Sequence, residues 1–162
     1  MSLRAQLDAT LAIAEATGKI AKVYKHLVYV NNNKDMLTFF KDVVNGRIDC
    51  AFITREATSS EDNGPDNNYD MHQISLSWYR TVSRAADDSI NSEDGFQNDV
   101  EAVRAAFNTN RKLTVNATHN APSFASPMEA RVVGYVMFQE SLCHYAELVF
   151  APKDGPNATR SA

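Results

Sequence analysis

A two-residue alternation over residues 73–83 constrains the fold of this chain more than any other feature. One set of side chains is apolar and the other is mainly hydroxyl-bearing: Ile74, Leu76, Trp78 and Val82 alternate with Gln73, Ser75, Ser77, Tyr79, Thr81 and Ser83. Successive side chains of a β-strand point to opposite faces of the sheet. The pattern therefore predicts a strand with one face on a core and a serine-rich face toward water or a partner.

Further segments also have strand character. Residues 47–55 are partly apolar on both faces, which is typical of a strand in the middle of a sheet. Residues 130–139 and 142–151 are separated by a very short connection and predict a hairpin, and residues 113–117 predict a short strand. Residues 19–30 combine helical spacing with strand-forming residues, so the sequence leaves their conformation open.

Apolar residues spaced three or four apart predict three helices, over residues 2–16, 35–45 and 92–107. In the third helix, Ser92 is the expected N-cap, and Glu93 and Asp94 suit the positive end of the helix dipole. Polar composition predicts loops in three places, over residues 58–70, 84–91 and 119–128.

These elements predict a single α+β domain over residues 1–151 and a polar C-terminal tail over residues 152–162. Short connections between successive strands predict a mainly antiparallel sheet of about four to six strands, with two to three helices packed on one face. An apolar content of 44% in 162 residues is that of an ordinary globular domain rather than a disordered chain.

The sequence predicts no catalytic, cofactor or metal site, and so no enzyme. Its four histidines and two cysteines lack the spacing of zinc ligands, and no nucleophile or phosphate-binding motif occurs. Cys50 and Cys143 fit a reduced intracellular chain. Without a long apolar run, neither a membrane span nor a secretory signal is expected.

The net charge of −4 is concentrated in the middle of the chain. Residues 57–110 hold 3 basic and 10 acidic residues, which gives this segment a net charge of −7. An acidic middle without a dense basic face argues against binding of nucleic acid through its phosphates. Such a charge pattern suits a protein that lies near DNA without adhering to it, but it is more commonly that of an ordinary soluble acidic domain.

Residues 72–82, 92–107 and 143–150 follow one another in a familiar order of strand, helix and strand. In this order the chain resembles the small tail-terminator, or tail-completion, proteins of long-tailed bacteriophages and prophages. The resemblance covers residues 35–150 and includes a strand ending near the pair Arg55-Glu56, followed by a polar excursion.

The resemblance implies a virion protein that assembles as a homo-oligomeric ring, commonly a hexamer. Such a ring would cap the head-proximal end of the tail tube and bind both the tail tube protein and the head–tail connector proteins. DNA would pass through its lumen without specific binding. The protein would reside in the virion tail, and in the host cytoplasm during assembly.

Two groups of residues are the candidate contacts. The acidic residues of the expected 58–70 loop are candidates for the lumen or a ring contact: Glu61, Asp62, Asp66 and Asp70. The polar face of the 73–83 strand is a candidate for contact with an adjacent subunit, through Ser75, Ser77 and Tyr79. Two alternatives stay open: a tail tube, baseplate or neck subunit, and a small enzyme or ligand-binding domain that uses His72, His119 or His144.

Overall fold

The computed structural model describes residues 3–26, 40, 47–62, 68–83, 86–111, 113, 126–138 and 141–152. Its elements are α1 (Leu3–Ala16), β1 (Lys22–Lys25), β2 (Asp49–Asp62), β3 (Asn68–Thr81), α3 (Ala86–Thr109), β4 (Glu129–Phe138) and β5 (Ser141–Phe150). The five strands form one sheet in the order β1-β2-β3-β5-β4. β1 runs parallel to β2, and the other neighbouring pairs are antiparallel. The predicted α+β class with a mainly antiparallel sheet is confirmed.

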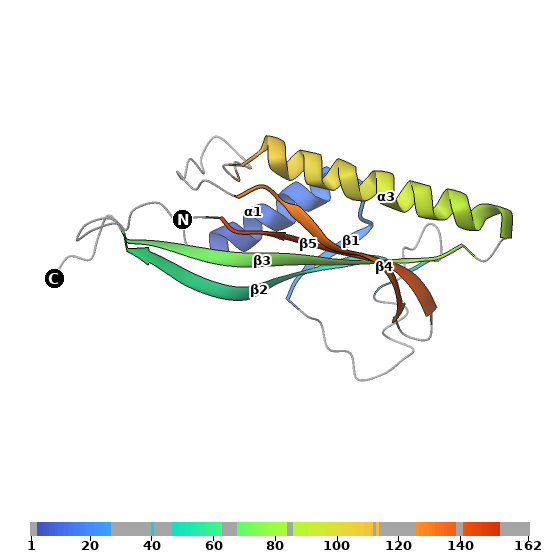
Figure 1. Ribbon diagram of the computed structural model, residues 1–162, viewed down its shortest axis with the longest axis horizontal. Coiled ribbons are helices and arrows are strands. Elements are labelled where there is room, and N and C mark those ends of the chain that lie inside the picture. The colour runs from blue at the N-terminus through green and yellow to red at the C-terminus, as the bar shows by residue number, and fades with distance from the viewer. Residues whose placement is uncertain are drawn as a thin grey trace.

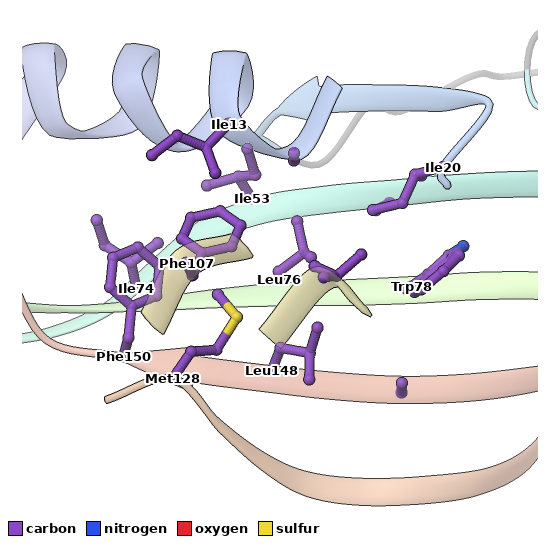
Figure 2. Packing of buried hydrophobic residues seen from close by; sticks show 14 of the residues in the cluster. Ile13, Ile20, Ile53, Ile74, Leu76, Trp78, Phe107, Met128, Leu148 and Phe150 are labelled. Carbon is purple, nitrogen blue, oxygen red and sulfur yellow. The ribbon is translucent and has the colours of Figure 1, made fainter. Parts of the chain in front are cut away.

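Both α1 and α3 lie on the same side of the sheet, which we call the helix face (Figure 1). Ile13 of α1 packs there beside Ile53 of β2, and Phe107 of α3 packs beside Phe150 of β5, as Figure 2 shows. Ile74, Leu76 and Trp78 have no exposed surface, so the predicted apolar face of β3 is confirmed. Complete burial of each such side chain contributes roughly 1.5–3 kcal/mol to folding.

A charged network joins α3 to the sheet beside this core. Arg80 of β3 binds Asp49 of β2 (Nε to Oδ2, 3.1 Å) and Asp99 of α3 (Nη1 to Oδ2, 2.8 Å). The indole N–H of Trp78 donates to the other oxygen of Asp49 at 2.7 Å. Burial raises the pKa of Asp49 despite the neighbouring Arg80 charge. Burial also acts on Asp99, but hydrogen bonds from Arg80 and Lys19 outweigh it and lower the pKa of that carboxyl.

The opposite side of the sheet, here called the far face, carries a second and smaller cluster. Phe40, which has helical backbone conformation, contacts Phe52 of β2 and Phe138 of β4, with ring centroids 5.5 and 5.6 Å apart. Tyr79 of β3 stacks on Phe138 at 4.5 Å. The rest of the helix expected over residues 35–45 lies outside the described residues.

The prediction of a loop over residues 58–70 is wrong at both ends of that range. β2 continues to Asp62 and β3 begins at Asn68, with paired residues as far as Asp62↔Asn68. We call residues 58–62 and 68–72 the β2–β3 arm, which extends beyond the ends of the other strands (Figure 1). Backbone hydrogen bonds between two strands do not require apolar side chains, so polar composition misled the prediction.

The predicted start of the long helix is also wrong. α3 begins at Ala86 rather than Ser92, so Ser92 lies inside the helix and not at its N-cap. The sequence has acidic residues at 87 and 88 as well as at 93 and 94, and both pairs suit a first helical turn. The pattern alone could therefore not distinguish the two starts.

Most other boundaries agree closely with the sequence. α1, β4 and β5 each begin and end within one residue of the predicted bounds, and β4 and β5 form the expected hairpin. β2 lies between β1 and β3, as its two-sided apolar pattern predicted. Within residues 19–30, the open segment, residues 22–25 form β1. Leu113 is not in a strand, and residues 114–117 of that expected strand lie outside the described residues.

Candidate functional site

The acidic candidates lie on the β2–β3 arm rather than in a loop. Glu61 and Asp62 belong to β2 and Asp70 belongs to β3, where it pairs with residue 60. Asp66 lies outside the described residues. Asp70 lies five residues before Ser75 and nine before Tyr79, which is about 17 to 30 Å of extended strand. On β3, the acidic candidate and the three candidates of the 73–83 strand are therefore separated along the strand.

The three candidates on β3 share the far face but differ in exposure. Ser75 is only 1% exposed, whereas Ser77 and Tyr79 are half-buried. Burial, reinforced by the Tyr145 hydroxyl, raises the pKa of Tyr79 to about 12. The expectation that this whole face meets water or a partner fails at Ser75, because the chain's own side chains cover it.

A polar row crosses the far face at the base of the arm. Gln73 of β3 donates a hydrogen bond to Glu56 of β2, and Arg131 of β4 forms an ion pair with the same carboxylate at 3.4 Å. Glu147 of β5 lies directly across from Ser77. Burial and the neighbouring Glu56 carboxylate raise the pKa of Glu147. The row is a polar surface with its charges already partly paired.

The strongest candidate for a binding surface was missed by the sequence reasoning. The large exposed apolar side chains among the described residues all lie on the β4–β5 hairpin: Val132, Val133, Tyr135, Met137 and Leu142. We call this set the β4 patch. The exposed fraction of these side chains reaches 63% at Met137, and β4 is an edge strand of the sheet. An apolar edge strand is a template for pairing with another chain.

A signal for this patch was present in the sequence. Residues 130–139 are apolar on both strand faces, which normally indicates a strand buried between neighbours. The sequence did not reveal that this strand forms an edge of the sheet, because edge position depends on the order of strands. The two-sided apolar character together with the edge position is what makes β4 unusual.

A cluster around His144 is the one place where the described residues bring catalytic residue types together. The Nε2 atom of His144 lies 2.8 Å from the Ser92 hydroxyl, and its Nδ1 atom lies 3.4 Å from Oε2 of Glu93. Tyr135 donates a hydrogen bond to the same Glu93 carboxylate. Burial, opposed by the Glu93 charge, lowers the pKa of His144, so the ring is neutral near pH 7.

This cluster has the residue order of a hydrolase triad but not its geometry. Nδ1 of His144 makes no hydrogen bond among the described residues, so Glu93 does not orient the ring as a triad acid does. Ser92 lies inside α3, where the neighbouring backbone N–H groups are used by the helix and cannot stabilise an oxyanion. We interpret the cluster as a packing contact between α3 and the β4–β5 hairpin.

Among the described residues, neither the remaining histidines nor the two thiols belong to a second cluster of catalytic residue types. His72 is buried, with Nδ1 3.0 Å from the Thr58 hydroxyl, and His119 lies outside the described residues. Burial raises the pKa of the Cys50 thiol to about 12 and that of Cys143 above its usual value. Both thiols are therefore protonated and unreactive near neutral pH.

The part of the chain that the structure describes contains neither a grouping of metal ligands nor a helix suited to a membrane. No three His, Cys, Asp or Glu side chains are grouped there so that they could bind a metal ion. No helix there combines the length and apolar character needed to cross a bilayer. Comparison with models of known protein families and with curated proteins found no match.

Proposed function

We propose that this chain is the tail terminator of a long-tailed bacteriophage or prophage. In this proposal, six copies close into a ring at the head-proximal end of the tail tube, stop its growth and join it to the head–tail connector. The ring has a mass of about 108 kDa for six copies of an 18.0 kDa chain. The role is mechanical and involves no reaction centre.

The β4 patch is the observation that carries this proposal. A ring needs a contact surface that each copy presents to another molecule, and this apolar edge strand provides one. Burial of exposed apolar side chains is the main favourable contribution to association between proteins. The order of strands and helices, which resembles that of the tail-terminator proteins, supports the same function.

The charge distribution agrees with a ring around passing DNA. The arm belongs to the acidic segment of the chain, and its sequence holds Glu61, Asp62 and Asp70. Acidic groups facing a lumen repel phosphate, so DNA could move through without being held. In this account the arm faces the lumen or a neighbouring copy.

Tail tubes assembled from the tube protein of the same genome test the function. We expect the wild-type chain to bind tube ends and stop their growth, as seen by electron microscopy. Met137→Lys places a charge in the β4 patch and should abolish ring formation and capping without changing the melting temperature. Ala105→Lys, at an exposed position of α3, is the matched control and should behave like the wild type. Tubes that grow normally with wild-type protein would refute the proposal.

A further inference from the structure

Two long strand edges have no partner strand among the described residues, apart from the outer edge of the four-residue β1 and the end of β3 beyond β5. One is the outer edge of β4, along Glu129–Phe138. The other is the outer edge of β2 from Thr54 to Asp62, because its pairing with β1 ends at Lys25↔Ile53. The edges are of similar length, ten and nine residues, and lie on opposite sides of the sheet. Each presents backbone donors and acceptors to a neighbour.

Strand direction makes these two edges compatible. The antiparallel pairs β2–β3, β3–β5 and β5–β4 mean that β2 and β4 run in opposite directions. When a rotated copy continues the sheet, β4 of the first copy meets β2 of the next in antiparallel orientation. The alternation of the four strands is then repeated across the joint without interruption.

The two open edges begin at different heights along the strand direction, so two copies that pair through them are displaced relative to each other. One row across the sheet shows this: Val133 of β4 pairs with Ala146, which pairs with Trp78, which pairs with Ala51 of β2. Ala51 itself is paired with β1, and the open part of β2 starts three residues further on. A joint between the open edges therefore shifts each copy along the strand direction. A sheet that closes on itself requires such a shift.

The side chains of the two edges also differ in polarity. The β4 edge is apolar, whereas exposed residues 55–59 of β2 are charged, small or hydroxyl-bearing. A contact between unlike surfaces is heterologous and can propagate around a ring, whereas a contact of β4 with itself stops at two copies.

We propose that β4 of one copy pairs antiparallel with residues 54–62 of β2 in the next copy. This inference rests on the proposed ring and names its copy-to-copy contact. The base of the neighbouring arm then lies beside the β4 patch, and the arm becomes part of the subunit interface.

Single and paired cysteines test the joint. Val132→Cys lies on the β4 edge and Ser59→Cys on the exposed open edge of β2, and the two positions are opposite each other when residues 129–138 and 54–62 pair along their length; the natural Cys50 and Cys143 are fully buried. With a short bismaleimide linker, we expect the double variant to give a ladder of covalent species up to six copies on a denaturing gel. Each single variant should stay monomeric on the gel, and a mixture of the two should give dimers only. Ser59→Cys combined with Glu101→Cys, on the outer side of α3, is the control and should give no ladder.

Three results would overturn the inference. Linking of Val132→Cys alone would mean that β4 pairs with β4 of a second copy. A ladder in the control would mean that linking is not specific to the joint. A double variant that forms the ring in solution but gives no ladder would place the contact elsewhere and leave the proposed function intact. The proposed function fails separately, when the wild type neither forms a ring nor binds tube ends.

Discussion

Arg131 on β4 binds Glu56 on β2 at 3.4 Å, although β3 and β5 lie between these two strands. Both residues sit at register shifts, between Arg55 and Ala57 in β2 and between Ala130 and Val132 in β4. Bulges bend a strand and increase its twist. The rings of Phe52 and Phe138, on the same two strands, also approach to 6.4 Å. The sheet therefore curls around its far face and brings side chains of β2 and β4 together.

Glu147→Gln should stabilise the protein slightly near neutral pH. The pKa of Glu147 is raised in the folded state by burial and by Glu56, so the folded state binds this proton more readily than the unfolded state does. Its contribution to stability then falls as pH rises through and above the usual carboxyl range. We expect a melting temperature about 1–2 °C higher than wild type at pH 7, with no gain near pH 4. A lower melting temperature at pH 7 would contradict this account of the polar row.

Arg80→Ala should be strongly destabilising. Its guanidinium binds both Asp49 and Asp99 and lies 4.7 Å above the Trp78 ring. Removing it leaves the partly buried Asp49 carboxylate without its charge partner. We expect urea denaturation to show a loss of about 2–4 kcal/mol in the free energy of unfolding. Arg104→Ala, which removes an ion pair to exposed Glu101, is the control and should cost less than about 1 kcal/mol.

His144→Gln should flatten the pH dependence of stability. The pKa of His144 is lowered in the folded state, so the unfolded chain binds this proton more readily. Stability from this group is fully present above the ordinary histidine pKa of about 6.5 and decreases as pH falls below it. Denaturation between pH 7.5 and pH 5 should therefore give a steeper decline for wild type than for the variant. Equal slopes would show that His144 titrates alike in both states.

Ser92 should not behave as a nucleophile. Because Nδ1 of His144 lacks a hydrogen bond and α3 offers no oxyanion site, we expect no covalent labelling of the folded protein by a fluorophosphonate probe. Intact-mass measurement after incubation provides the readout, with Ser92→Ala as the comparison. Stoichiometric labelling that this substitution removes would favour the enzyme alternative.

The sequence was most informative where one face of an element is buried. The alternation around Trp78 and the spacing of Phe96, Val100, Val103 and Phe107 located β3 and the body of α3, because burial imposes those periods. The arm was misassigned because its pairing depends on backbone hydrogen bonds, which leave no apolar pattern. The Arg131–Glu56 contact and the edge position of β4 depend on strand order and curvature. Neither property is encoded in a local stretch of sequence.

The mass of the purified wild-type protein by native mass spectrometry tests the central claim most directly. The account predicts a closed assembly of six copies, near 108 kDa, from chains of 18.0 kDa. It also predicts that Met137→Lys shifts this signal to the monomer. A wild-type chain that stays at 18.0 kDa at every concentration, or one that forms polymers of unlimited length, would contradict a ring that ends growth.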